Sequence, residues 1–81
     1  MDDAEILDRI HHIVDAEREL RQHLAEDPDD ARDTRARMRG LEESLDQCWD
    51  LLRQRRARKE FGEDPNTAEA RPVAEVESYL Q

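Results

Sequence analysis

The sequence has few of the residues that build an ordinary globular core. Only 36% of its 81 residues are hydrophobic, 43% are charged, and Trp, Tyr and Phe occur once each. A chain this short buries a small share of its surface, and this composition is close to that of disordered chains. The spacing of the apolar residues, not their number, must therefore decide whether the chain folds.

Cysteine and long apolar runs are also scarce, and each shortage excludes a class of protein. The single cysteine, Cys48, excludes an internal disulfide framework and fits a reducing cytosol. No stretch approaches the roughly 20 apolar residues that a membrane span needs. Residues 1–5, MDDAE, lack the basic start and apolar run of a secretion signal. We therefore expect a soluble cytoplasmic protein.

Negative charge dominates, because the sequence contains 22 acidic residues and only 13 Lys and Arg, which gives a formal net charge of −9. Residues 1–26 and 62–81 are acidic, whereas acids and bases balance over residues 27–61. An acidic chain does not attract nucleic acid or an anionic membrane as a whole. Such a partner would need a local basic patch.

Over the first third of the chain, apolar residues recur at gaps of three and four residues. This spacing is the seam of a coiled coil and predicts a helix over about residues 3–25. Glu17 takes one seam position, where we expect it to set the register or to pair across the hairpin with an Arg such as Arg37. The other seam positions are Ile6, Ile10, Ile13, Leu20 and Leu24.

A break follows at Asp27 and Pro28, since the first is a good capping residue and the second suits the start of a helix. The turn, at about residues 26–28, is short, so the two helices should lie antiparallel. The second helix is expected over about residues 28–61 and should end at Gly62. Its seam positions are Ala31, Thr34, Met38, Leu41, Leu45, Cys48 and Leu52.

Folding the chain about this turn predicts an all-α, coiled-coil-like hairpin over residues 1–61. Ile6 should then lie near Leu52, and the acidic residues 2–5 should approach the basic residues 55–59 at the end of the second helix. Residues 62–81 are expected to form a loop and a short tail helix or strip, too brief to be stable alone. The candidate docking residues of this tail are Val73, Val76, Tyr79 and Leu80.

A lone two-helix hairpin has little interior, and Trp49 and Leu51 fall outside its narrow seam. We expect them to need a cover, which predicts a homo-oligomer, preferably a dimer that forms a four-helix bundle. Gly40 could mark a close approach of two helices, but we favour a weak point in the helix. The candidate oligomer interface consists of Ile6, Ile10, Ile13, Leu20, Met38, Leu41, Leu45, Cys48, Trp49 and Leu52.

A basic run near the end of the second helix is the candidate anion or partner patch. Clustered Arg residues neutralise phosphates, but cations also favour a helix carboxyl end and pair with nearby acids. We prefer the second interpretation, and nucleic acid is the alternative partner. The run consists of Arg53, Arg55, Arg56, Arg58 and Lys59.

No catalytic, metal-binding or cofactor-binding residue is predicted. His11, His12 and His23 lack the spacing of zinc ligands on one helix face, and Cys48 is interpreted as a small buried hydrophobe. An all-helical enzyme of the chorismate mutase type is a remote alternative, because the Arg residues fall at helix ends and outer faces. We expect a non-enzymatic assembly or adaptor protein.

Three segments resemble an uncharacterised bacterial family catalogued as domain of unknown function 2630. They are LDQCWDLLRQRRARKEFGED at residues 45–64, DDAEILDRIHHIV near the start and ARPVAEVESYLQ at the end. The resemblance implies a short helical protein of the bacterial cytoplasm with no established activity. It assigns no residue a role, although residues 46–50 carry most of the likeness.

Overall fold

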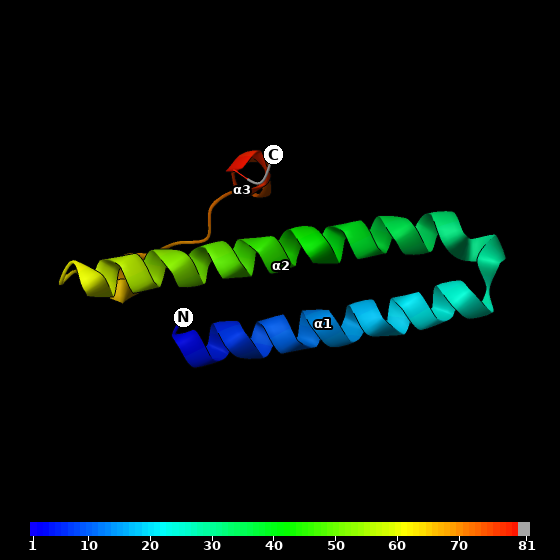
Figure 1. Cartoon of the computed structure of the whole chain (residues 1–81), viewed down its shortest axis with the longest axis horizontal. Coiled ribbons are helices and arrows are strands. Elements are labelled where there is room, and N and C mark those ends of the chain that lie inside the picture. Colours follow the sequence, from blue (N-terminus) through cyan, green and yellow to red (C-terminus); the bar gives the residue numbers. More distant parts are fainter. Residues whose placement is uncertain (80–81) are drawn as a thin grey trace.

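A computed structural model describes residues 1–79 of the chain. Three α-helices follow one another: α1 (Asp3–Glu26), α2 (Ala31–Glu60) and α3 (Val73–Tyr79). The two long helices form an antiparallel hairpin (Figure 1), and the molecule measures 52 × 25 × 14 Å. The predicted all-α hairpin is confirmed.

The start of α1 and the turn after it follow from acidic side chains. The Asp2 Oδ1 atom accepts a hydrogen bond from the Glu5 backbone N–H at 2.8 Å and so caps the helix. After Glu26, the chain forms a 3₁₀ turn over Pro28–Asp30. The second helix therefore begins at Ala31 and not at Pro28, because this turn is closed by the shorter i to i+3 hydrogen-bond pattern.

The hairpin core lies between α1 and the second half of α2. One face of α1 presents apolar side chains at helical spacing, and the facing side of α2 supplies a thiol and a leucine. Partly buried leucines of α2 extend the contact toward the turn. The buried cluster consists of Ile6, Ile10, Ile13, Cys48 and Leu51.

The end of α2 reverses the chain through Gly62, whose φ is +73°. Its N–H donates to the Lys59 carbonyl at 3.2 Å, and the Glu63 N–H donates to the Arg58 carbonyl at 2.7 Å. This is the Schellman pattern, which needs a left-handed residue and therefore favours glycine. The chain then runs back along α2 through a second 3₁₀ turn, Pro65–Thr67.

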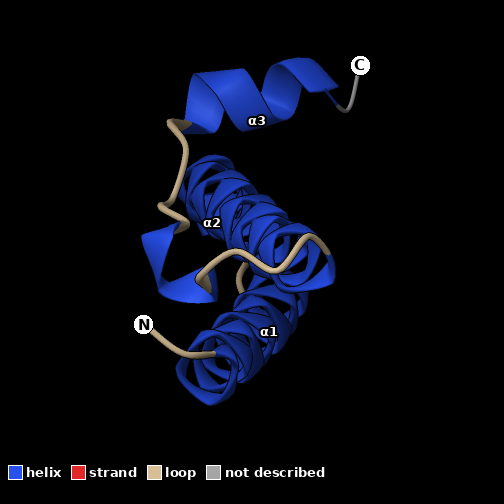
Figure 2. Cartoon of the chain, turned by 90° about the vertical axis from the view of Figure 1, so that its left-hand side faces the viewer, coloured by secondary structure: helices blue, strands red, loops and turns tan. Residues whose placement is uncertain are grey.

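The returning segment places α3 across α2, on the side away from α1. Figure 2 shows α2 as the middle layer between the other two helices. Val76 of α3 is buried, with 1% of its surface exposed. The expectation that Leu51 needs a partner molecule is wrong, because Ala68 in the returning segment packs against the cluster that contains it.

Candidate interaction surfaces

Part of the predicted oligomer interface is used inside the hairpin itself. Ile6, Ile10, Ile13 and Cys48 belong to the buried core, so a second molecule could reach them only if the hairpin opened. Trp49 is different, since 42% of its surface is exposed. The remaining candidates are half-buried along the hairpin: Leu20, Met38, Leu41, Leu45 and Leu52.

Trp49 lies on one flank of the hairpin together with exposed apolar residues of α1. It lines a hollow of about 290 Å³ with Asp3, Leu52, Arg53 and Arg56. Leu7 follows Asp3 by one helical turn and Val14 follows Leu7 by two, so both share the flank of Asp3. Their exposed fractions are 41% and 37%. We call the surface formed by Leu7, Val14 and Trp49 the Trp49 face.

The basic run does not form one patch, because Arg55 is buried. Its Nε donates to Asp3 Oδ1 at 2.5 Å, and its Nη1 donates to the Pro65 carbonyl at 3.2 Å and to Asn66 Oδ1 at 3.1 Å. A buried guanidinium is tolerated only with such partners. Arg55 therefore joins the start of α1, the end of α2 and the returning segment, and it is not available to a ligand.

The other members of the basic run divide into two groups. Lys59 Nζ lies 2.9 Å from Asp3 Oδ2, and Arg58 Nη1 lies 3.3 Å from Glu63 Oε2. The hydrogen bonds from Lys59 and then from Arg55 lower the pKa of Asp3. Arg53 and Arg56 are exposed and form no ion pair with any residue from 1 to 79. The two arginines of the basic run that form no ion pair are therefore the two that line the hollow beside Trp49.

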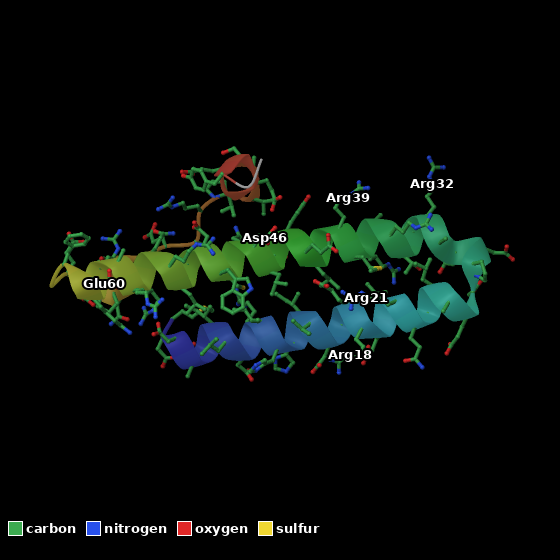
Figure 3. All side chains as sticks on the ribbon, in the orientation of Figure 1. Arg18, Arg21, Arg32, Arg39, Asp46 and Glu60 are labelled. Carbon is green, nitrogen blue, oxygen red and sulfur yellow. The ribbon has the colours of Figure 1, made fainter. Side chains whose placement is uncertain are left out.

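Further free cations of α2 point elsewhere. Figure 3 shows Arg32 and Arg39 extending from α2 on the side away from α1. Within the described part of the chain, neither one forms an ion pair. The Arg residues of α2 therefore do not gather into one basic stripe.

The tail is fastened to α2 by polar side chains. Gln47 Nε2 donates to the Arg71 carbonyl at 2.7 Å, and Gln54 Nε2 donates to the Glu69 carbonyl at 2.9 Å. The buried Asp50 accepts from Gln54 at 3.0 Å and lies 3.6 Å from Arg71 Nε. Gln47 and Asp50 carry the family resemblance but no recognisable chemistry of their own, and this anchoring gives them a role.

The predicted docking residues of the tail are placed unequally. Val76 is buried and Val73 is half-buried, whereas Tyr79 is exposed. The Tyr79 hydroxyl donates to Glu75 Oε1 and accepts from Arg71 Nη1, each at 2.9 Å. Leu80, the fourth candidate, lies outside the described residues.

Acidic side chains meet where α3 crosses α2. A hydrogen bond with Asp46 raises the pKa of Glu77, and burial raises it further. The negative charges of Asp46, Glu43 and Glu42 act in the same direction. We therefore expect the docking of α3 to depend on protonation at this contact.

A second hollow lies near the turn, on the flank that the Trp49 face does not occupy. It has a volume of about 630 Å³, and Ala16, Leu20, Gly40 and Leu41 supply its apolar lining. A Cβ added to Gly40 would meet no atom within 4 Å. Gly40 therefore does not permit a close approach of two helices; it faces open space.

Glu17 does not pair across the hairpin as predicted. Its Oε2 lies 3.1 Å from Arg21 Nη2 on the same helix, and Arg37 pairs instead with Asp33 at 3.3 Å. In both cases the partner is four residues away, where helix geometry brings side chains together. The buried Oε1 atom of Glu17 has no hydrogen-bond partner among residues 1–79.

The residues considered for metal binding or thiol chemistry are dispersed. His11 is exposed, His12 lies beside Asp8, and His23 bonds to Asp30 across the turn at 3.1 Å. Burial raises the pKa of the Cys48 thiol, which keeps it protonated. Across residues 1–79, no three His, Cys, Asp or Glu side chains are arranged to hold a metal ion.

These features define a class of small helical hairpin whose tail is fastened along its second helix. Over residues 1–79, no helix combines the length and apolar character needed to cross a membrane. The chain belongs to the family described as "Protein of unknown function (DUF2630)", whose model matches residues 2–81, so the predicted resemblance is confirmed.

Relatives of the chain occur in mycobacteria. Uncharacterised proteins of Mycobacterium bovis and of Mycobacterium tuberculosis H37Rv are each 43% identical to it over 77 residues. The alignments cover 95% of this chain and 88% of each relative. No solved structure matches the chain.

Proposed function

We propose that this chain is a small non-enzymatic assembly protein that self-associates and acts through protein–protein contacts. The observation that carries the proposal is the Trp49 face. Trp49 is the chain's one tryptophan; 42% of its surface is exposed, and the exposed Leu7 and Val14 lie on the same flank of the hairpin. Tryptophan is enriched at the centres of protein interfaces, where truncating it commonly costs the most binding energy.

The course of the tail supports the proposal, because the tail leaves the Trp49 face uncovered. The returning segment covers Leu51, and α3 lies on the side of α2 away from α1. The Trp49 face remains open to solvent on a chain that is 43% charged. Apolar residues gathered on an otherwise charged surface are typical of an interaction site.

Sedimentation equilibrium across micromolar concentrations tests the proposal. We expect the wild-type chain to form a dimer, and Trp49→Ala to raise the dissociation constant by about tenfold or more, since such truncations commonly cost above 1 kcal/mol. Phe61→Ala is the matched control, because Phe61 is also aromatic and is 81% exposed at the end of α2. A wild-type chain that stays monomeric would overturn the proposal.

Binding of nucleic acid is the second candidate function, and it depends on the exposed, unpaired Arg53 and Arg56. Its support is narrower, because Arg55, Arg58 and Lys59 are engaged with acids of the same chain. Two free cations in the basic run of a chain of net charge −9 attract a polyanion only weakly. Steeply salt-dependent binding of DNA or RNA, lost on Arg53→Ala and Arg56→Ala, would favour this candidate.

A further inference from the structure

We infer that the partner on the Trp49 face is a second copy of this chain, with the two α2 helices antiparallel, a two-fold axis at Trp49, and Arg56 of each copy paired with Glu42 of the other. This inference rests on the proposed function and adds a geometry to it. It follows from the spacing and exposure of three residues on α2 and from the unpaired charges of two of them.

The three residues form one stripe along α2. Glu42, Trp49 and Arg56 follow one another at intervals of seven residues, and seven residues bring a helix back to nearly the same face, with a drift of only about 20°. At 1.5 Å per residue, Glu42 and Arg56 lie about 10.5 Å on either side of Trp49. An acid and a base therefore flank the exposed tryptophan at equal distances.

Both flanking charges are available to a partner. Glu42 and Arg56 are exposed, and no ion pair joins either of them to a residue between 1 and 79. Arg53 is also free, and it lines the hollow beside Trp49 with Arg56. By contrast, Asp46 faces Glu77 of α3 and raises its pKa, whereas Glu42 acts on Glu77 through its charge alone.

Symmetry decides how two such stripes can meet. A two-fold axis perpendicular to the stripe at Trp49 exchanges positions 42 and 56, because each is seven residues from the axis. Each Arg56 then meets a Glu42, and the pairing occurs twice, as an isologous interface requires. A parallel arrangement would place Arg56 against Arg56 and Glu42 against Glu42, and like charges across an interface are unfavourable.

The hollow near the turn is a weaker place for a second copy. Its lining contains no aromatic residue, and its one arginine, Arg37, pairs with Asp33. Its carboxylate, Glu19, forms no ion pair with a residue between 1 and 79, but no unpaired base lies opposite it. The hollow therefore offers neither an aromatic anchor nor an acid and a base on either side of one, whereas the Trp49 face offers both.

Reciprocal charge reversal tests the geometry. In the antiparallel dimer, Arg56→Glu alone creates two acid–acid contacts and Glu42→Arg alone creates two base–base contacts. We expect each single variant to raise the homodimer dissociation constant by about tenfold or more, because two favourable pairs become two unfavourable ones. An equimolar mixture of the two variants should form a one-to-one heterodimer, since both contacts are then opposite in charge.

The double variant Arg56→Glu/Glu42→Arg should recover a homodimer close in affinity to the wild type. Arg32→Glu is the matched control, because Arg32 is exposed on α2 and points away from α1 (Figure 3), and it should leave the dissociation constant unchanged. Circular dichroism of each chain shows whether it has remained helical. Recovery in the mixture also proves that both single variants fold.

The outcomes separate this inference from the proposed function. If Trp49→Ala weakens the dimer but Arg56→Glu and Glu42→Arg behave like Arg32→Glu, the antiparallel geometry is wrong and the self-associating protein stands. If each single variant self-associates as tightly as the wild type while their mixture associates more tightly than the wild type, the helices are parallel and the inference is likewise overturned, because a parallel wild-type dimer already contains two like-charge contacts. A wild-type chain that stays monomeric would contradict both the proposed function and this inference.

Discussion

Arg55 and Asp3 form an ion pair that closes the open end of the hairpin, although 52 residues separate them in the sequence. Arg55 Nε lies 2.5 Å from Asp3 Oδ1. The same guanidinium reaches the returning segment at Pro65 and Asn66. One buried side chain thus fixes the relative positions of three parts of the chain.

The first prediction concerns this arginine. We expect Arg55→Ala to lower the free energy of unfolding by about 2–3 kcal/mol, because it removes charge-assisted hydrogen bonds and leaves acceptors unpaired. Arg39→Ala is the control, since Arg39 is exposed on α2, takes no part in the proposed dimer contact, and should change stability by less than about 0.5 kcal/mol. Urea unfolding at one fixed protein concentration measures both. Equal effects would show that Arg55 does not hold these segments together.

The difference between Arg55 and Arg56 was partly readable in the sequence. The seam positions Leu41, Cys48 and Arg55 are seven residues apart, so extending the seam by one heptad places Arg55 on the face toward α1. The heptad position of Arg55 was overlooked because Arg55 was grouped with its basic neighbours in one candidate patch. The approach of the acidic residues 2–5 to the basic residues 55–59 was predicted, because folding the chain about one turn brings the start of α1 to the end of α2.

The course of the tail could not be predicted in the same way. Residues 62–72 are held by side-chain amides that donate to backbone carbonyls, such as Gln47 to Arg71 and Gln54 to Glu69. A contact to a carbonyl leaves no periodic pattern, because every residue carries one. The covering of Leu51 was missed for this reason, whereas the apolar seam of the hairpin was found from its spacing.

The second prediction is a pH dependence that arises from Asp3. Its carboxylate is stabilised by Lys59 and Arg55, so its pKa in the folded chain lies below the ordinary value of 3.8. The unfolded chain therefore binds this proton more readily, and the stability that the pair contributes is present above pH 3.8 and lost as pH falls through the folded pKa. Asp3→Asn should lower the melting temperature at pH 7 and flatten its decline toward pH 3. Asp15→Asn, at an exposed site, should follow the wild type.

The third prediction concerns the docking of α3, which should weaken as pH rises and not as pH falls. The pKa of Glu77 is raised above 4.5 by Asp46 and by burial, so the docked state holds the proton more tightly. Docking should be strongest below pH 4.5 and should weaken as pH rises through the raised pKa. Hydrogen exchange of the amides of α3 should therefore show more protection at pH 4 than at pH 7, after correction for the intrinsic exchange rate.

Neutral variants separate this contact from a general effect of acid. Glu77→Gln and Asp46→Asn should each remove most of the pH dependence of protection in α3. Glu43→Gln should remove less, because Glu43 acts on Glu77 through its charge alone. A protection profile that Glu77→Gln leaves unchanged would show that α3 docks without a proton at this site.

The fourth prediction uses the two glycines of the chain, which a Cβ would affect in opposite directions. Gly40 lies inside α2 with no atom near the Cβ position, so Gly40→Ala should raise the free energy of unfolding by about 0.5–1 kcal/mol through helix propensity. Gly62 also has open space, but its φ is +73°. Gly62→Ala should lower the free energy of unfolding by about 1–2 kcal/mol, since the left-handed conformation is costly for a residue with a Cβ. Urea unfolding of the pair at one protein concentration distinguishes them, and a gain at both positions would contradict the Schellman end of α2.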